Sequence, residues 1–292
     1  MSRAARPTIR FRTMREDDVP FGMHLKETAG WNQTEDDWRT FIALSPEGCL
    51  VALADGEPAG TVVAVDHQGL VGWVALLLVA PEHRRRGIGT ALLEEALRML
   101  DHCETVKLDA TPEGRKVYEK LGFEDEYALT RLAHAGFPPG SPSPPPPAAG
   151  VRPLRKDDLE RVSAFDREVS GRARGALLKA WHRGAPGYAH VAEDAGELRG
   201  FVLGRHGALR EHLGPLVAPD RDTAAALLST ALAGTGGQPV FLDAFLHDPG
   251  WPAYLHSIGF TPARQLFRMF RGTNHHPGMP RLQWAASGPE LG

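Results

Sequence analysis

A short segment rich in arginine and glycine carries the clearest chemical signal in the sequence. It lies between an apolar stretch typical of a buried strand and a stretch with helical periodicity, and it reads Val79-Ala80-Pro81-Glu82-His83-Arg84-Arg85-Arg86-Gly87-Ile88-Gly89-Thr90-Ala91-Leu92. Gly87 and Gly89 have no side chains, so backbone N–H groups can approach a ligand closely. The helix that follows adds unpaired N–H donors and a partial positive charge at its N-terminus. With three adjacent arginines, the segment suits a pyrophosphate group.

Three other interpretations of this segment compete with that one. A P-loop would need Lys and then Ser or Thr after its second glycine, and neither is present. A dinucleotide fingerprint would need a third glycine in place of Leu92, although Asp109 stands about 20 residues further on, where an acidic partner is expected. Residues 81–86 also separate the strand from Gly87, which is too long for that tight turn. A solvated charge run before an ordinary helix is the third alternative.

The elements that would position this segment are those of an α/β fold with a central mixed sheet. The predicted strands cover residues 8–13, 49–53, 60–65, 71–79, 105–110 and 125–132, and the predicted helices cover 90–100 and 112–121. Residues 71–79 are nearly all apolar, as in a strand buried on both faces. Asp55-Gly56 is a strong hairpin signal between two of the strands.

The chain contains an internal duplication. Four landmarks recur in the same order, pairing residues 11–19 with 151–159, 51–60 with 191–200, 78–82 with 216–220, and 121–123 with 258–260. Between the copies, residues 136–149 read GFPPGSPSPPPPAA, which predicts an extended, polyproline-like spacer. We therefore expect a first domain at 1–135, a linker at 136–150, a second domain at 151–272 and an irregular tail at 273–292.

The first copy resembles the GNAT superfamily of N-acetyltransferases. Residues Arg84–Gly89 match the motif Arg/Gln-x-x-Gly-x-Gly/Ala, and Tyr118–Phe123 match Tyr-x-Lys-x-Gly-Phe, whereas Thr111 and Gly114 stand where family members often have Asn and Ala. The resemblance covers residues 8–133. It extends more weakly to residues 151–271, which are similar to the divergent second domain of some two-domain members of the family. It implies two tandem domains, each a mixed, mostly antiparallel twisted sheet flanked by helices.

The resemblance also implies a cosubstrate, acetyl-CoA, and the residues that hold it. The backbone from Arg84 to Thr90 would bind the pyrophosphate, and that near Leu78 and Val79 would pair with the pantetheine arm like an added strand. The implied contact residues are Leu78, Val79, Arg84, Arg85, Arg86, Gly87, Ile88, Gly89, Thr90 and Thr111. Tyr118 would face the departing sulfur, since a phenol of pKa about 10 can donate a hydrogen bond or a proton to a thiolate.

The general base and the acceptor pocket are less defined. Candidates for the base are Asp109, Glu27, His24 and Glu126. Asp109 could instead pair with a basic side chain, and because residues 71–79 contain no Glu, a water relay is a further option. The segment that covers the acceptor in the family contains Trp31, Asn32 and Trp38, which could equally be packing residues.

The second copy lacks the features of a cofactor loop. Three residues are missing and both loop glycines are gone, while Asp220 and Asp222 at the helix start would repel a pyrophosphate. Leu255 stands where the tyrosine is expected, with Tyr254 beside it. We predict that this copy binds no CoA and either completes the acceptor pocket or provides pseudo-dimer packing.

These observations favour an N-acetyltransferase that transfers an acetyl group by direct attack of a primary amine. The acceptor would be a small molecule or amino-acid-like, and the protein a monomer or a homodimer. Two alternatives remain, a non-catalytic acyl-CoA-binding or regulatory module and a protein N-acetyltransferase. An open acceptor groove would favour a protein N-acetyltransferase.

Bulk properties disfavour several other classes. The net charge of −3 gives no global attraction to nucleic acid or an anionic membrane, and no uncharged apolar run is long enough to span a bilayer. The basic start lacks the apolar run of a secretory signal, and only two cysteines occur, so a cytoplasmic location is expected. We expect no metal site, because no ligand spacing links the C-terminal histidines, His247, His256, His275 and His276.

Overall fold

The chain divides into two compact units, the first ending at Lys107 and the second beginning at Leu108. The computed structural model describes residues 8–137 and 150–292, so most of the predicted spacer lies outside the described residues. The boundary between the units falls within one strand, β5 (Thr105–Ala110). The units therefore differ from the two sequence copies, and the domain limits drawn from the sequence stay a prediction.

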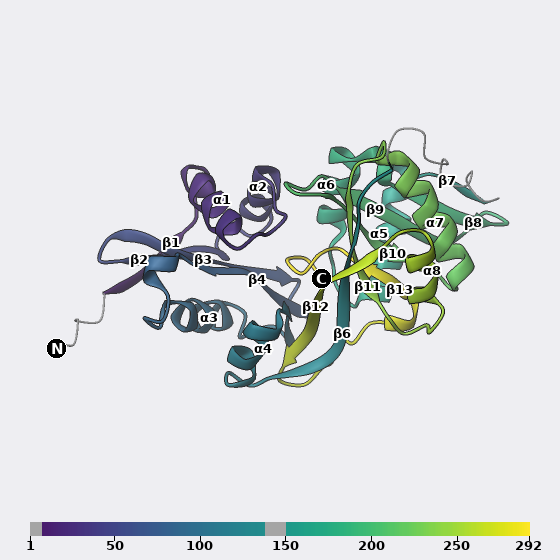
Figure 1. The fold of residues 1–292 in the computed structure, drawn as a ribbon. Coiled ribbons are helices and arrows are strands. Elements are labelled where there is room, and N and C mark those ends of the chain that lie inside the picture. Colours follow the sequence, from purple (N-terminus) through teal and green to yellow (C-terminus); the bar gives the residue numbers. More distant parts are fainter. Residues whose placement is uncertain (1–7, 138–149) are drawn as a thin grey trace. The chain divides into compact units, whose positions relative to one another are not determined.

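The first unit is a sheet with helices on both faces (Figure 1). Its elements are β1 (Ile9–Thr13), α1 (Val19–Thr28), α2 (Glu35–Leu44), β2 (Cys49–Ala54), β3 (Glu57–His67), β4 (Val71–Val79), α3 (Ile88–Met99) and the start of β5. The strand order is β1-β2-β3-β4-β5, antiparallel except for the parallel pair β4 and β5. Helices α1 and α2 cover one face and α3 covers the other.

The sequence patterns correctly located the elements around the glycine-containing segment. The buried face of α3 includes Leu92, Leu93 and Ala96, the residues whose helical spacing predicted it. Helix α3 packs closely on β3 at Gly60, where an added Cβ would lie 3.1 Å from Leu92 Cδ1. The strand predicted at residues 105–110 is β5 with the same limits.

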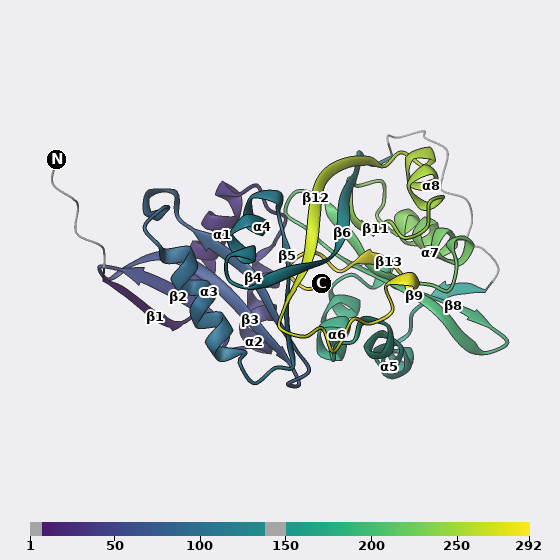
Figure 2. The ribbon, with the colours of Figure 1, turned by 90° about the horizontal axis from the view of Figure 1, so that it is seen from below.

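The second unit is a larger sheet, also covered on both faces, by α7 and α8 on one side and α5 and α6 on the other (Figure 2). Its elements are the end of β5, α4 (Pro112–Glu119), β6 (Phe123–His134), β7 (Val151–Pro153), α5 (Leu159–Ser170), α6 (Gly175–Gly184), β8 (His190–Asp194), β9 (Glu197–Arg205), β10 (Glu211–Val217), α7 (Arg221–Gly234), β11 (Val240–Phe245), α8 (Trp251–Ser257), β12 (Thr261–Arg271) and β13 (Gln283–Ala286).

Strand β6 joins the sheet of the second copy, although it is the last strand of the first copy in sequence. It pairs antiparallel with β11 on one edge and with β12 on the other. From β12 onward the order is β12-β6-β11-β13-β10-β9-β8-β7. The last strand of the first copy thus lies between two strands of the second, which is why the compact units do not follow the sequence repeat.

The tail after residue 272 is irregular only in part, because two short regular elements lie within it. It contains a short 3-10 helix (Pro280–Leu282) and strand β13, whose four residues are all buried. Strand β13 pairs antiparallel with both β10 and β11. Trp284 fixes the strand further, because its Nε1 donates to the Ala218 carbonyl oxygen at 3.0 Å and its ring meets that of Trp251 edge-on.

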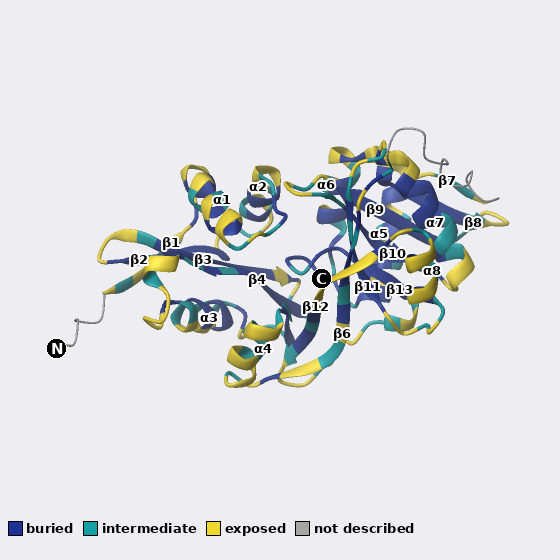
Figure 3. Cartoon of the chain, in the orientation of Figure 1, coloured by how far each residue is buried: buried dark blue, intermediate teal, exposed yellow. Residues whose placement is uncertain are grey.

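Burial follows the sheets. In each unit the strands are largely buried, while exposed residues gather on the outer faces of the helices and in the turns (Figure 3). Among the described residues, no helix combines the length and apolarity needed to cross a bilayer.

Candidate functional site

The segment after β4 forms a left-handed turn that opens directly onto helix α3. A short 3-10 helix (Pro81–His83) follows β4, and Arg85 then adopts a positive φ of 62°. Gly87 occupies the N-cap of α3 with φ of 84°, a conformation that glycine adopts without strain. Because Gly87 has no side chain, it forms no side-chain cap on the helix. The N–H groups of the first helical turn are therefore left for a ligand or solvent.

Gly89 keeps the same helix end uncovered. A Cβ at this position would meet only Val79 Cγ2, at the ordinary contact distance of 3.5 Å. The packing of the fold thus does not require glycine here, whereas close approach of a ligand would. The absence of side chains at both glycines leaves an open helix N-terminus that suits an anion.

Two of the three arginines of this segment extend into solvent. Arg85 and Arg86 are exposed. Arg84 is also exposed, but its Nε donates to the Val79 carbonyl oxygen at 3.1 Å and so folds the side chain back over the end of β4. Arg85 and Arg86 can therefore meet a phosphate directly.

Strand β4 carries an irregularity just before the predicted cofactor edge, which the sequence did not indicate. Leu76 has a positive φ of 47°, and its carbonyl oxygen accepts a hydrogen bond from Thr61 Oγ1 at 3.0 Å. The pairing with β3 shifts by one residue there and resumes at Leu78 and Val79. Such bulges redirect the backbone groups that follow them.

Tyr118 lies on α4 and is half-buried, with its ring edge-on to that of Phe123 at 5.9 Å between centroids. Burial raises the pKa of Tyr118 to about 12. Full proton transfer to a thiolate of pKa about 8.5 would then be uphill by about 5 kcal/mol. The neutral phenol therefore suits hydrogen-bond donation better than proton transfer.

The two residues that depart from the family pattern both have a structural role beside Tyr118. Thr111 is the N-cap of α4, and its Oγ1 accepts a hydrogen bond from the Gly114 N–H at 3.2 Å. A Cβ on Gly114 would lie only 3.1 Å from Tyr118 Cε2. Glycine at 114 thus gives the ring of Tyr118 the space that it occupies.

Of the two roles predicted for Asp109, general base or partner of a basic side chain, the structure shows the second. The fully buried carboxylate accepts two hydrogen bonds of 2.8 Å from Arg268, which lies on β12 of the second copy. Burial acts against the charged guanidinium, but Asp109, together with Tyr127 and Glu126, raises the pKa of Arg268. Arg268 also donates to the Tyr127 hydroxyl at 3.0 Å. A carboxylate held in this way is not available as a base.

The second copy contains the counterpart of this pair. Asp243, in the repeated triplet Leu-Asp-Ala, forms a buried two-bond pair with Arg131 of β6, both hydrogen bonds being 2.7 Å. Arg131 belongs to the first copy and Arg268 to the second. The last strand of each copy thus supplies the arginine that neutralises the aspartate of the other.

The structure also places the other sequence candidates. His24 and Glu27 are exposed on α1, and Glu126 accepts a hydrogen bond from Asn274 Nδ2 at 2.8 Å. Trp38 is fully buried against Gly22 and is therefore a packing residue. Asn32 is buried in the turn between α1 and α2.

The second copy closes the helix end that the first leaves open. Its N-cap is Asp220, whose carboxylate accepts a hydrogen bond from the Thr223 N–H at 2.8 Å. One N–H of the α7 N-terminus is thus already bound by an anionic group of the protein itself. This carboxylate would also repel a phosphate.

The β10 edge of the second copy is also occupied. Leu216 and Val217, which correspond in sequence to Leu78 and Val79, pair with Ala285 and Gln283 of β13. The chain's own strand therefore takes the backbone pairing that a pantetheine arm would need.

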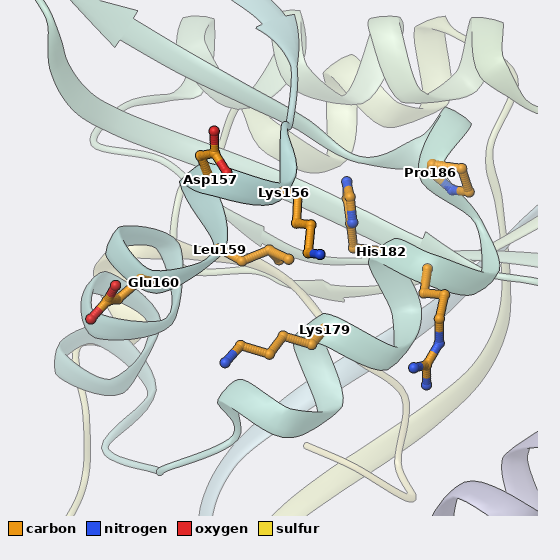
Figure 4. Close-up of a pocket in the computed structure, with 8 residues that line it drawn as sticks. Lys156, Asp157, Leu159, Glu160, Lys179, His182 and Pro186 are labelled. Atoms are coloured by element: carbon orange, nitrogen blue, oxygen red, sulfur yellow. The ribbon is translucent and has the colours of Figure 1, made fainter.

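A separate groove of about 960 Å³ lies on the second unit, beside α5 and α6 (Figure 4). Its lining is mostly charged and comprises Lys156, Asp157, Leu159, Glu160, Lys179, His182, Arg183 and Pro186. None of the residues predicted from the sequence lies in it.

Comparisons with known proteins identify the class to which this fold belongs. The family profile described as "Acetyltransferase (GNAT) family" matches residues 13–123, and that described as "Acetyltransferase (GNAT) domain" matches residues 162–282. A holothin acyltransferase of Pseudoalteromonas sp. is 30% identical over 260 residues, which cover 88% of this chain and 86% of the relative. The chain belongs to the GNAT family, with two GNAT domains in tandem, and it is an acyltransferase of the N-acetyltransferase class.

Solved structures share the fold over nearly the whole chain. A protein from Pyrococcus horikoshii superposes with a TM-score of 0.80 at 22% identity, covering 97% of this chain and 96% of the other. A tandem GNAT protein from the clavulanic acid biosynthesis pathway superposes with a TM-score of 0.64 at 17% identity, covering 90% and 98%. At these identities the likeness concerns the fold.

Proposed function

We propose that the chain is an acetyl-CoA-dependent N-acetyltransferase in which only the first copy binds the cosubstrate. The observation that carries this proposal is the contrast between the two helix ends. Gly87 leaves the N-terminus of α3 without a side-chain cap, whereas Asp220 caps α7 with a carboxylate. An anionic ligand gains from the first arrangement and is repelled by the second.

In the first copy, the backbone N–H groups from Arg85 to Thr90 bind the pyrophosphate, since that of Arg84 already donates to the Pro81 carbonyl oxygen, and the exposed Arg85 and Arg86 add charge. The backbone at Leu78 and Val79 pairs with the pantetheine arm. The Val79 N–H, or one next to it, polarises the thioester carbonyl as an oxyanion donor would.

The acetyl group passes directly from the thioester to the neutral amine of the acceptor. An amine of pKa about 10.4 must first lose its proton, which costs roughly 4 kcal/mol at pH 7.4. Because Asp109 is held by Arg268, we propose that this proton leaves through water. Tyr118 donates a hydrogen bond to the departing sulfur, which suits a phenol that stays neutral.

We propose a small primary amine as the acceptor. The support is the relative that covers most of the chain, whose name assigns it holothin as substrate. A test is CoA release from acetyl-CoA with a panel of holothin, other small amines, amino acids and short peptides with free N-termini. We expect turnover with small amines, and a KM for acetyl-CoA that rises by about 20-fold or more in Gly89→Asp.

Two results of this assay would contradict the proposal. Acetyl-CoA binding without turnover on any acceptor would indicate a non-catalytic acyl-CoA-binding module. Turnover restricted to the peptides would indicate a protein N-acetyltransferase.

A further inference from the structure

Three side chains with metal-binding donor atoms meet in the first unit, away from the glycine-containing segment. Asp66 lies near the end of β3, while His102 and Cys103 lie in the turn between α3 and β5. One donor atom from each residue lies within 4.8 Å of the other two. No local motif indicates this group, because Asp66 is 36 residues away from His102 in the sequence.

The backbone holds the two turns together and so fixes the three residues. The Gly69 N–H donates to Asp66 Oδ1 at 2.6 Å, which orients the carboxylate. The Glu104 N–H donates to the Gly69 carbonyl oxygen at 2.9 Å, joining the turn after β3 to the turn before β5. Main-chain contacts therefore orient the Asp66 carboxylate and hold the turn that carries His102 and Cys103 beside it.

The three side chains are close enough for one donor atom of each to reach the same ion. His102 Nε2 lies 3.1 Å from Asp66 Oδ2, Cys103 Sγ lies 3.6 Å from Asp66 Oδ1, and Cys103 Sγ lies 3.8 Å from His102 Nε2. A tetrahedral ion with bonds of about 2.0–2.3 Å holds its donor atoms roughly 3.3–3.6 Å apart. His102 and Cys103 contact different oxygens of Asp66, so the carboxylate or the two facing side chains would shift to place one oxygen, the nitrogen and the sulfur on a single ion.

We propose that Asp66, His102 and Cys103 form a binding site for a divalent transition-metal ion of the zinc class. Imidazole nitrogen and thiolate sulfur select such ions over Mg²⁺ and Ca²⁺, which prefer oxygen donors. The side chains of Asp66 and His102 are about half exposed, so an ion can enter from solvent and keep water as its fourth ligand.

The site lies far from the chemistry proposed for the first copy. It precedes Val71, at the start of β4, whereas the glycine-containing segment follows Val79 at the other end of this nine-residue strand. At about 3.3 Å per residue, roughly 26 Å separate the two strand ends. A bound ion would therefore join two turns and stabilise the first unit, without entering acetyl transfer.

The test is titration of the untagged, chelator-treated protein with Zn²⁺ by calorimetry and with Co²⁺ by absorption. We expect one ion per chain, a cobalt–thiolate charge-transfer band in the near ultraviolet, and a higher melting temperature with Zn²⁺. Cys103→Ser should abolish the cobalt–thiolate band. His102→Ala and Asp66→Asn should weaken binding by more than about 100-fold, beyond the 10- to 100-fold loss typical of residues that only support a ligand. The matched control is His24→Ala, an exposed histidine of the same unit, which should bind as the unaltered protein does.

Two results would overturn the site. One is the absence of Zn²⁺ and Co²⁺ binding to the unaltered protein. The other is unchanged binding in Cys103→Ser with melting behaviour that shows the variant to be folded.

Discussion

Gly89→Asp should separate cofactor binding from folding. Gly89 is the second residue of α3, and a Cβ there has space, with Val79 Cγ2 at 3.5 Å as its nearest contact. Aspartate has a better helix propensity than glycine, and a carboxylate in the first turn interacts favourably with the helix dipole. We expect the free energy of unfolding to rise by up to about 1 kcal/mol.

The carboxylate of Asp at position 89 should also weaken acetyl-CoA binding. With two pyrophosphate charges about 5 Å away, the repulsion is about 1.7 kcal/mol even at the dielectric constant of water. This corresponds to a roughly 20-fold increase in Kd, and a site partly shielded from water would give more. The substitution thus stabilises the fold while it weakens acetyl-CoA binding.

The assay is calorimetric titration with acetyl-CoA, combined with thermal unfolding of both proteins. Ala176→Asp is the matched control, because Ala176 is the exposed second residue of another helix, α6. It adds the same charge at the same helical position and should leave Kd unchanged. A folded Gly89→Asp variant that binds acetyl-CoA normally would refute the assignment of this segment.

Three further changes test other parts of the structure. Tyr118→Phe should lower kcat about 10- to 100-fold, the value of one hydrogen bond to a charged group, without changing the Kd for acetyl-CoA. Because burial raises the pKa of Tyr118 to about 12, its phenol stays neutral as the pH rises through 10. The opposite result would be a rate that falls with an apparent pKa near 10 in the unaltered protein but not in Tyr118→Phe, and it would contradict this role. Arg268→Met should lower the free energy of unfolding by about 3–5 kcal/mol in denaturant titration, since it leaves the Asp109 charge buried and unpaired. The double variant Asp109→Leu/Arg268→Met should lose less free energy of unfolding than Arg268→Met alone. An equal or larger loss would count against an ion-pair effect. Trp284→Ala should cost about 3–5 kcal/mol through loss of a buried ring, and a loss below 1 kcal/mol would argue against anchoring of β13 by this residue.

The sequence was informative where structure depends on local pattern. The apolar run of β4 and the helical spacing of Leu92, Leu93 and Ala96 placed the elements on either side of the glycine-containing segment. Gly87 was identified as special from its residue type, and its φ of 84° gives the physical reason. The repeat of landmarks also indicated two domains, which the family profiles confirm.

The sequence did not predict features that depend on pairing between strands distant in the chain. A strand pattern does not say which strand lies beside it, so the place of β6 between β11 and β12 could not be foreseen. Strand β13 is only four residues long in a tail rich in glycine and proline, and its stability comes from pairing on both edges.

The sequence does contain one signal of the ion pairs that link the two copies. The triplet Leu-Asp-Ala occurs at Asp109 and Asp243, and an arginine follows in the last strand of each copy, Arg131 and Arg268. Each aspartate must be neutralised when buried, so a repeated Asp and a repeated Arg on neighbouring strands point to ion pairs. Sequence alone gives no means of deciding whether each arginine serves its own copy or the other.

The stoichiometry of acetyl-CoA binding distinguishes a chain with one cosubstrate site from a chain with two. Calorimetric titration of the whole chain should give one molecule of acetyl-CoA bound per chain, and Gly89→Asp should weaken that single site. Two sites per chain, or a site that is unaffected by Gly89→Asp, would contradict the account of one open and one capped helix end.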